Sequence, residues 1–506
     1  MPSYRSRSLL IALSTAAVAT TLSMSAGSTA AATTTPAPLT WTPCAQPDGP
    51  AAQECATLPV PLDYRDPTGP QLSLAVSRIR SDRPDARRGV LMVLPGGPGG
   101  SGVQQLAPKS KSLLPRLKGA YDLVALDPRG VGGSTRASCQ LPPADRHMVT
   151  LRSWPGPDGR IDENIERSRR TADLCARNGG AALRSFTSAN QARDMDLLRI
   201  ALGERKISTW SVSYGAYVGA VYAQKFPHRT DRWVLDSIGD PDPARVAQGW
   251  MANTSQAVED RFPDFAKWAA DPARDKQDKL RLAQHPYQVR DLFLKLAARL
   301  DHSPMESTTP GVPLTGNRLR QSLHNTLNNN KFEPLATTIQ QALKADPEDK
   351  PVLAPEVAGP LPDEDAAITM AVICNDVRWP AGPGTVDAYR RNVAENRARF
   401  PLTAGLPANI TPCSFWKWAP AERPTRITSE GPSNVLLVQN RRDPATPYFG
   451  ALKMRAALGD RARMITVEDP GGHGAYLKNG NACGDDLVTT FLTTGKRPAK
   501  DTYCTK

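Results

Sequence analysis

A serine at the start of an expected helix is the first residue that could do covalent chemistry. Ser213 is the centre of the stretch SVSYG at 211–215, which lies between an expected strand at 207–210 and an expected helix at 214–226. A sharp strand-to-helix turn that lifts a serine above a sheet is typical of a nucleophile elbow. The usual motif has glycine where Ser211 stands, although a serine is still small. We predict Ser213 as a nucleophile, with a purely structural turn as the alternative reading of this motif.

A histidine and an aspartate follow the serine in the order that a catalytic triad of the α/β-hydrolase type requires. His473 lies in a glycine-rich stretch just after an expected strand at 462–469, and Asp443 lies just after an expected strand at 434–440. A histidine there could act as general base, and the aspartate could hold its tautomer and stabilise the imidazolium. The alternative reading of a lone histidine is a structural one.

Two other aspartates compete with Asp443 for the role of the acid. Asp236 ends the strand expected after the elbow helix, where some hydrolases of this kind place their acid. Asp469 is too near His473 in the sequence to be favoured. The sequence therefore favours Asp443 and keeps Asp236 as the alternative.

A glycine-rich loop after an expected strand could donate hydrogen bonds to an oxyanion. The stretch PGGPGGSG occupies residues 95–102, and its position matches the loop that supplies the second oxyanion donor in this type of fold. We predict the backbone N–H groups of Gly97 and Tyr214 as the two donors. A phosphate-binding loop is the alternative, but the glycine stretch lacks the required G-K-[ST] ending. The later stretch DPRGVGGS at 127–134 is interpreted as a structural turn near the site.

The elements that would position these residues alternate between buried strands and helices. That rhythm predicts βαβ units and a mainly parallel sheet flanked by helices, the α/β-hydrolase fold. A helix is expected from Ser188 to Leu202, with Ser188 and Gln191 as a capping box. The expected strands are at 58–62, 72–79, 90–94, 121–126, 207–210, 232–236, 434–440 and 462–469.

The strand rhythm stops near residue 240 and returns near residue 431. We therefore expect a first core part at 33–240, an inserted helical lid at 241–430 and a C-terminal core part at 431–506 that carries Asp443 and His473. An unstructured loop of that length would be unusual in a compact domain.

The N-terminus and the cysteines predict export from the cell. Residues 1–32 have a basic start, a moderately apolar run and small residues at cleavage positions, which is typical of a signal peptide. A membrane anchor is the alternative. The 8 cysteines are even in number and scattered, so we expect disulfides, paired as neighbours along the chain, rather than a zinc site. Some free thiols are the alternative.

Composition excludes several classes of function. The net charge is +13, yet basic residues are spread along the chain and aromatic residues make up only 6%. Nucleic-acid binding would need basic residues gathered on one element, so no nucleic-acid partner is expected. After the first 30 residues, no stretch is apolar enough to span a bilayer, so no stable membrane association is expected. The chemistry outlined above needs no metal or other cofactor.

These features together resemble the secreted tripeptidyl aminopeptidases, a branch of the proline-iminopeptidase-like α/β-hydrolases. The likeness runs from about Trp41 to the C-terminus. Ser211 departs from the glycine usual at that elbow position. The stretches that carry the likeness are ECAT at 54–57, PLDY at 61–64, LPGGPGGS at 94–101, DPRG at 127–130, DPATP at 443–447 and GHG at 472–474.

The resemblance implies a secreted serine exopeptidase that removes short peptides, often tripeptides, from free N-termini through an acyl-enzyme. It also implies that proline can stand next to the cut and that lid carboxylates hold the substrate amine. Asp376 is the candidate for that role, while the acidic cluster at 363–365 is interpreted mainly as solvated surface charge. The alternatives are an esterase or lipase with the same chemistry and an inactive binding protein on a hydrolase scaffold.

Overall fold

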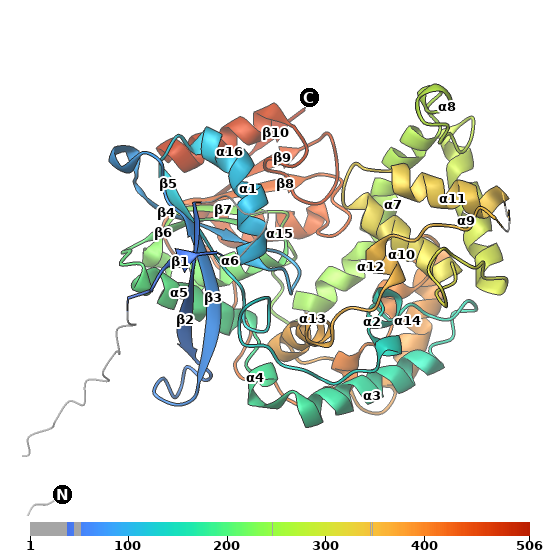
Figure 1. Cartoon of the computed structure of the whole chain (residues 1–506), viewed down its shortest axis with the longest axis horizontal. Coiled ribbons are helices and arrows are strands. Elements are labelled where there is room, and N and C mark those ends of the chain that lie inside the picture. The colour runs from blue at the N-terminus through green and yellow to red at the C-terminus, as the bar shows by residue number, and fades with distance from the viewer. Residues whose placement is uncertain (1–37, 45–51, 245, 345, 347, 506) are drawn as a thin grey trace, which may run out of the picture. The chain divides into compact units, whose positions relative to one another are not determined.

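One mixed sheet organises the computed structural model, which describes residues 38–44, 52–244, 246–344, 346 and 348–505 (Figure 1). Its ten strands lie in the order β1-β2-β3-β5-β4-β6-β7-β8-β9-β10. The strands from β5 across to β10 pair in parallel, whereas β1, β2 and β3 pair antiparallel at one end of the sheet. The predicted mainly parallel sheet is confirmed. The predicted signal peptide at 1–32 lies outside the described residues.

Every strand expected from the sequence is present. Most strand ends differ from the expected ones by only a few residues. The run of buried apolar residues sets each strand, because a strand in a parallel sheet is covered on both faces. The strands are β1 (Thr42–Pro43), β2 (Gln53–Pro61), β3 (Gln71–Ile79), β4 (Gly89–Leu94), β5 (Tyr121–Leu126), β6 (Ile207–Val212), β7 (Thr230–Asp236), β8 (Val435–Asn440), β9 (Ala462–Val467) and β10 (Thr502–Cys504).

Strand β4 shows how the two faces of the sheet are covered. Val90, Met92 and Leu94 belong to one apolar cluster with residues of α5 (Ser188–Ala201) and α6 (Tyr214–Lys225). The alternate residues Leu91 and Val93 belong to a second cluster with residues of α1 (Gly102–Leu117) and α16 (Ala482–Thr494). Successive side chains of a strand point to opposite faces, so helices cover both sides of the sheet (Figure 1).

The start of α5 differs by one residue from the predicted capping box. Thr187 is the N-cap, and its hydroxyl accepts a hydrogen bond from the Asn190 N–H. The expected cap, Ser188, lies inside the helix, where its hydroxyl contacts Tyr214 and Asp376 instead. Thr187 and Ser188 are both good cap residues, so tertiary contacts decided between them.

Between β7 and β8, the described residues form helices and turns and add no strand to the sheet. These helices have an apolar core of their own, which includes Phe265, Phe293 and Leu323. The predicted lid at 241–430 falls in this interval. The helices are α7 (Val246–Ala269), α8 (Ala273–Gln277), α9 (Pro286–His302), α10 (Gly316–Leu327), α11 (Glu333–Lys344), α12 (Pro355–Ala358), α13 (Asp363–Asp376), α14 (Thr385–Arg399), η4 (Leu406–Ala408) and η5 (Pro412–Phe415).

A second segment, between β5 and α5, packs against the inserted helices rather than on the sheet. It contains α2 (Met148–Leu151), α3 (Asp162–Asn178) and α4 (Gly180–Arg184). Trp154 clusters with Leu406, and Ile161 clusters with Val393 of α14. The predicted first core part at 33–240 therefore includes a stretch that packs with the lid helices. The sequence has turn residues there, such as PGPDG at 155–159, but nothing in it marked the stretch as one that packs with the inserted helices.

Four disulfides join the cysteines as neighbours along the chain, as predicted. Among the described residues no cysteine is free. The 374–413 bridge links α13 to η5, so it fixes two inserted elements to each other. The pairs are Cys44–Cys55, Cys139–Cys175, Cys374–Cys413 and Cys483–Cys504.

The turn at 127–134 has the structural role expected of it. The Asp127 carboxylate accepts hydrogen bonds from the Ser101 hydroxyl and the Val103 N–H, which anchors the start of α1. The Arg129 guanidinium is buried and donates two hydrogen bonds, of 2.6 and 2.7 Å, to Asp194 of α5. Asp194 also accepts a hydrogen bond of 2.6 Å from the Tyr64 hydroxyl. The turn therefore ties the first strands to the helices around the site.

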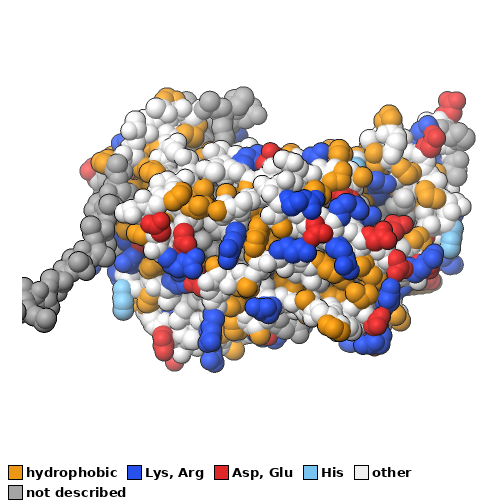
Figure 2. All heavy atoms as spheres, turned by 90° about the horizontal axis from the view of Figure 1, so that it is seen from below, with side chains coloured by type: hydrophobic (Ala, Val, Ile, Leu, Met, Phe, Trp, Pro, Cys, Tyr) orange, Lys and Arg blue, Asp and Glu red, His pale blue; other side chains and the backbone are white. Residues whose placement is uncertain are grey.

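The surface mixes charge of both signs with apolar groups. On the face shown in Figure 2, Lys and Arg side chains lie among Asp and Glu side chains. None of the helices in the described ranges is both long and apolar enough to cross a membrane.

Candidate active site

Ser213 lies in a strained turn between β6 and α6. Its φ is 62° and its ψ is −128°, a conformation that L-residues rarely adopt and that often marks a functional position. The Ser213 N–H donates a hydrogen bond of 2.9 Å to the carbonyl of Asp236 on β7, which holds the turn in place. A Cβ at Gly215 would lie 2.4 Å from the Pro95 carbonyl oxygen, so the turn needs glycine there.

The unusual serine at the other side of the elbow is accommodated by a helix glycine. Ser211 is fully buried, and its hydroxyl lies 2.8 Å from the Thr209 hydroxyl. A Cβ at Gly219 of α6 would lie only 2.8 Å from the Ser211 hydroxyl oxygen. The missing side chain on α6 makes room for the extra one on β6, so the helix still packs closely under the elbow.

His473 and Asp443 are brought together at the carboxyl ends of β8 and β9. Nδ1 of His473 lies 3.0 Å from each of the two carboxylate oxygens of Asp443. The contact orients the imidazole and fixes Nδ1 as the protonated nitrogen, which leaves Nε2 as the base.

The carboxylate of Asp443 is buried but well provided with donors. It accepts hydrogen bonds from the backbone N–H groups of Ala445 and Thr446 and from the Thr446 hydroxyl. Burial alone would raise the pKa of Asp443, but His473 and these donors outweigh burial and hold the pKa below its ordinary value. Asp443 is therefore suited to stay ionised beside the imidazole.

The rival acid, Asp236, lies under the same loop but contacts its backbone instead of the imidazole. Its carboxylate accepts hydrogen bonds of 2.8 and 3.0 Å from the N–H groups of Ala475 and Tyr476, and another from the Trp210 ring N–H. Burial raises the pKa of Asp236 in spite of these donors. The contacts make Asp236 a positioning residue for the loop that carries His473.

The inserted helices also hold that loop. The His473 N–H donates a hydrogen bond of 2.9 Å to the carbonyl of Asn328, the C-cap of α10. From the sheet side, the Asn440 side chain donates to the carbonyls of Gly472 and Gly474. The orientation of His473 thus depends on both the sheet and the end of α10.

Ser213 and His473 line the same cavity, although no hydrogen bond joins their side chains among the residues that the structure describes. In unliganded hydrolases this contact is often long and shortens when substrate binds. Gly97, one of the predicted oxyanion donors, lines this cavity as well.

The predicted oxyanion donors lie beside Ser213. A Cβ at the neighbouring Gly96 would be 3.2 Å from the Ser213 hydroxyl oxygen, so the loop at 95–102 passes close to the serine. Within the described ranges, the Gly97 N–H donates to no protein acceptor. Tyr214 is the first residue of α6, and the first N–H groups of a helix lack intrahelical acceptors. Both N–H groups are available to a substrate oxygen.

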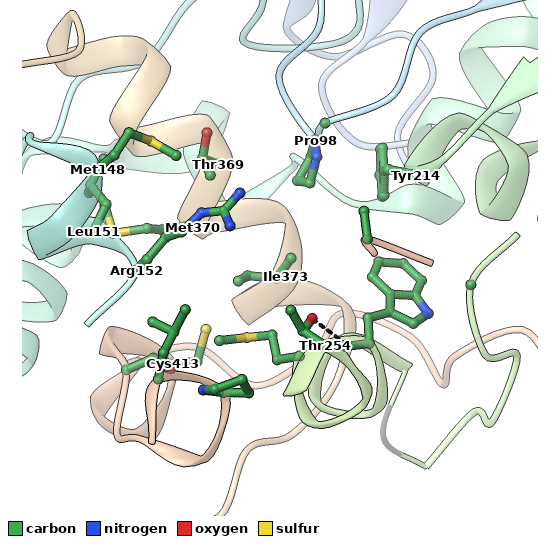
Figure 3. Close-up of a pocket in the computed structure, with 18 of the residues that line it drawn as sticks. Pro98, Met148, Leu151, Arg152, Tyr214, Thr254, Thr369, Met370, Ile373 and Cys413 are labelled. Carbon is green, nitrogen blue, oxygen red and sulfur yellow. Dashed lines mark hydrogen bonds between the residues drawn. The ribbon is translucent and has the colours of Figure 1, made fainter. Parts of the chain in front are cut away.

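Two cavities meet at Ser213. The lid-side cavity has a volume of about 270 Å³, its walls are mainly apolar, and more than half of its wall residues lie between β7 and β8 (Figure 3). Its walls are Gly97, Pro98, Met148, Leu151, Arg152, Ser213, Tyr214, Gly239, Trp250, Met251, Thr254, His324, Thr369, Met370, Ile373, Leu406, Pro407, Thr411, Pro412, Cys413, Ala445 and Thr446.

The core-side cavity has a volume of about 540 Å³ and lies between α1 and the loop of His473. It contains two lysines, one of which, Lys109, lies with its ammonium 5.0 Å from the centroid of the Trp210 ring. Its walls are Gly96, Gly97, Gly100, Gln105, Pro108, Lys109, Ser112, Trp210, Val212, Ser213, Asp236, His473, Gly474, Tyr476, Leu477 and Lys478.

Asp376, predicted to hold a substrate amine, lines neither of these cavities. Its carboxylate accepts hydrogen bonds from the N–H and the hydroxyl of Ser188, and the Ser188 hydroxyl lies 2.8 Å from the Tyr214 hydroxyl. Burial raises the pKa of Asp376 to about 6. Asp376 is thus one side chain removed from Tyr214, and its contact with an amine stays a prediction.

The acidic cluster at 363–365 binds other parts of the protein. Asp363 accepts hydrogen bonds from the backbone N–H groups of Gln140 and Leu141, and Arg136 forms ion pairs with Glu364 and Asp365. These contacts fasten α13 to the segment after β5. In the described part of the chain, no group of three or more His, Cys, Asp or Glu side chains is placed to hold a metal ion.

The two basic residues of the lid-side cavity, Arg152 and His324, were not predicted from the sequence. Both lie in parts of the chain without a recognisable motif, and Arg152 belongs to the segment that was assigned to the core. The nearby Pro155 and Gly156 signal only a turn. The sequence offered no signal for either residue.

An elbow serine, an ordered His–Asp pair and a parallel sheet define a serine hydrolase of the α/β-hydrolase class. The comparisons with known proteins narrow this class. A family model described as TAP-like protein matches residues 402–504. The tripeptidyl aminopeptidase of Streptomyces lividans is 33% identical over 493 residues, which cover 94% of this chain and 88% of that protein. Serine protease Hip1 of Mycobacterium tuberculosis is 27% identical and covers 92% and 91% of the two chains.

Among solved structures, a serine hydrolase from Cycloclasticus zankles matches 87% of this chain and 98% of its own, with 13% identity and a TM-score of 0.34. The sequence match to the Streptomyces enzyme spans nearly the whole of both chains. The chain belongs to the tripeptidyl aminopeptidase family of α/β-hydrolases, and it is a serine peptidase of that fold.

Proposed function

We propose that the protein is a secreted exopeptidase that releases short peptides, mainly tripeptides, from free N-termini, with Ser213, His473 and Asp443 as its triad. The observation that carries the triad is the contact of His473 Nδ1 with both oxygens of Asp443, at 3.0 Å each, next to the strained Ser213 turn. The name of the Streptomyces relative supports tripeptides as products.

The reaction follows from the geometry. Ser213 Oγ attacks the substrate carbonyl carbon while His473 Nε2 takes the hydroxyl proton. The N–H groups of Gly97 and Tyr214 stabilise the oxyanion that forms, each by about 3–4 kcal/mol. The C–N bond then breaks, and His473 returns the proton to the leaving amine. Water hydrolyses the acyl ester in a second round with the same residues.

The shape of the lid-side cavity supports release of a short peptide. Its volume of about 270 Å³ is small for a ligand pocket, which suits a few residues better than a long chain. The apolar walls, which include Trp250 and Met251, suit a proline ring next to the cut. Asp376 remains our candidate for holding the substrate amine. Because Ser188 and Tyr214 lie between its carboxylate and the cavity, it would act on the amine through these two side chains.

Products from a long peptide of known sequence test this proposal. Mass spectrometry should show successive losses of three residues from the N-terminus. N-acetylation of the same peptide should suppress cleavage, and Asp376→Asn should reduce the preference for the free amine. Internal cuts, or faster turnover of a short acyl ester than of any peptide, would favour the esterase alternative.

Export is proposed from the basic start, apolar run and small residues of 1–32 together with the four disulfides. Expression in a host with a general secretory route should place the enzyme in the medium. N-terminal sequencing of that protein should begin near residue 33. An intact N-terminus in the cell fraction would contradict the proposal.

A further inference from the structure

Arg152 brings a charge into a cavity that is otherwise uncharged. In the described part of the chain, the residues that line the lid-side cavity include no Asp, Glu or Lys. His324 is neutral, because burial and the adjacent Arg152 hold its pKa well below the ordinary value. Burial raises the pKa of Tyr214 far above its ordinary value, so this side chain is neutral too. The guanidinium of Arg152 is therefore the one full charge on the walls of this cavity that the structure describes.

No carboxylate of the protein balances that charge. Arg152 lies 3.3 Å from the imidazole of His324, Nη1 to Nε2, and forms no ion pair with the residues that the structure describes. Neutral His324 can accept that hydrogen bond but adds no opposite charge. The guanidinium has five N–H donors, and most of them remain available.

The side chain is aimed at the space that a substrate would occupy. Arg152 is the C-cap of α2, and Figure 3 shows its guanidinium extending between Thr369 and Ile373 of α13. Pro98 and Tyr214, which flank the proposed oxyanion site, lie on another side of the cavity. A bound acyl group would run from Ser213 toward Arg152.

Arg152 is half-buried, and a cation held partly out of water without a partner costs free energy that a bound anion can recover. Charges removed from water are normally paired, and removal of one partner from a buried pair is strongly destabilising. A planar guanidinium matches a carboxylate through two parallel hydrogen bonds. A carboxylate would therefore complement the one charge on the walls of the lid-side cavity.

We propose that Arg152 binds the carboxylate of an acidic side chain in the released peptide. The enzyme would then favour Asp or Glu on the N-terminal side of the residue whose carbonyl is attacked. This inference rests on the proposed exopeptidase function. In the acyl-enzyme the carboxyl end of the released peptide is esterified to Ser213, and its other end is an ammonium group. A side chain is the only source of a carboxylate there.

The position of Arg152 in the cavity determines which residue of the bound peptide it can contact. The residue that carries the attacked carbonyl must lie beside Ser213, Pro98 and Tyr214. Three extended residues span about 10 Å, which lets the first or second of them reach another wall. The acidic residue therefore occupies the first or second position of a tripeptide.

A set of matched tripeptide anilides tests this. Each is Ala-Ala-Ala-anilide with one residue replaced by Glu or by its neutral isostere Gln, at each of the three positions. We expect kcat/KM to be about 10-fold or more higher for Glu than for Gln at the first or second position, as suits one charge-assisted pair. In Arg152→Gln the ratio should fall to near unity, and in Arg152→Lys part of it should remain.

The matched control is Arg160→Gln, because Arg160 lies in the same segment but is exposed and pairs with Asp158. It should keep the wild-type ratio. A Glu/Gln ratio near unity in the wild type overturns the inference without any variant, and so does a ratio that survives in Arg152→Gln. Cleavage of neutral peptides without preference would leave the exopeptidase proposal standing. If no tripeptide anilide were cleaved, that proposal and this inference would fall together.

Discussion

The two cavities that meet at Ser213 are built from different parts of the chain. The core-side cavity is lined by α1, by the ends of β6 and β7 and by the loop of His473, which are regular elements of the sheet domain. The lid-side cavity is lined mostly by α7, α13, η4, η5 and the α2 segment. The core-side cavity contains both Ser213 and His473, whereas the lid-side cavity offers the apolar surface that we propose for substrate binding.

The two cavities also differ in the charged residues that line them. Lys109 and Lys478 occur in the core-side cavity together with Asp236, whereas Arg152 has no acidic neighbour among the residues described for the lid-side cavity. Asp236 attracts the charge of Lys109 in the core-side cavity. In the lid-side cavity, on our inference, the substrate supplies the opposite charge for Arg152.

Ser213 is shared by both cavities, so its removal gives the largest effect. Ser213→Ala should lower kcat by about 10⁶-fold, because the covalent route is lost while the oxyanion donors remain. Turnover of a peptide anilide, together with the thermal unfolding curve, measures this. The matched control is Ser211→Gly, which restores the usual elbow residue and should keep most of the activity. Comparable activity in Ser213→Ala would contradict the assigned nucleophile.

In the proposed triad Asp443 acts through His473, so its replacement should give the next largest effect. Asp443→Asn keeps the shape but holds the imidazole in the wrong tautomer, so kcat should fall by about 10⁴-fold. Asp469→Asn is the control, since Asp469 lies near His473 in the sequence and pairs with Arg442. Equal losses in the two variants would show that the assignment of the acid is wrong.

Much of the core-side half was predictable because its residues stand at fixed points of regular elements. A buried apolar run followed by glycines can form few structures other than a strand and a tight turn. Ser213, Asp443 and His473 each follow a buried strand, and parallel strands place their carboxyl ends at one edge. The details were less accessible. Whether Thr187 or Ser188 caps α5 depends on Asp376, which lies 188 residues from Ser188 in the sequence.

The lid-side half was not predictable, because its residues come together through packing alone. Arg152 lies before the elbow and His324 in α10, and their contact spans 172 residues. Neither belongs to a motif, and the segment around Trp154 gives no sign in the sequence that it joins the lid. Asp376 shows the reverse case. Its acidity made it a candidate for the cavity, but its carboxylate contacts Ser188 instead.

Removal of one disulfide should disturb the lid-side cavity alone. Cys413 lines that cavity and is bridged to Cys374 over a separation of 39 residues. Replacing both cysteines by alanine should lower the free energy of unfolding by about 4 kcal/mol on the chain-entropy account and should raise KM, because the cavity wall loosens.

Replacing Cys44 and Cys55 by alanine is the matched control. That bridge closes a shorter separation of 11 residues and lies outside both cavities, so its loss should cost about 3 kcal/mol and leave KM unchanged. Denaturant unfolding and peptide kinetics on both pairs of variants give the two quantities. An equal rise of KM in both double variants would contradict the claim that only the 374–413 bridge shapes the lid-side cavity.

The smallest expected effect concerns Lys109 in the core-side cavity. Burial lowers the pKa of Lys109 to about 8, although Asp236 attracts its charge. In the unfolded chain the ordinary value of about 10.5 applies. Between these two values the unfolded state binds more protons than the native state, so this group makes stability rise with pH from about 8 to about 10.5. At pH 7 both states are protonated, and the native state bears the cost of the buried charge.

Lys109→Met removes that charge but keeps an apolar stem over Trp210. The free energy of unfolding should therefore rise by about 1–2 kcal/mol at pH 7, less than the full pKa difference because the side chain is partly exposed. The gain should shrink as pH rises through 8 and vanish near 10.5, as urea unfolding at several pH values can measure. Lys118→Met, on the exposed end of α1, is the control and should show no such trend. A gain that is constant with pH would mean that packing, not the buried charge, separates the variant from the wild type.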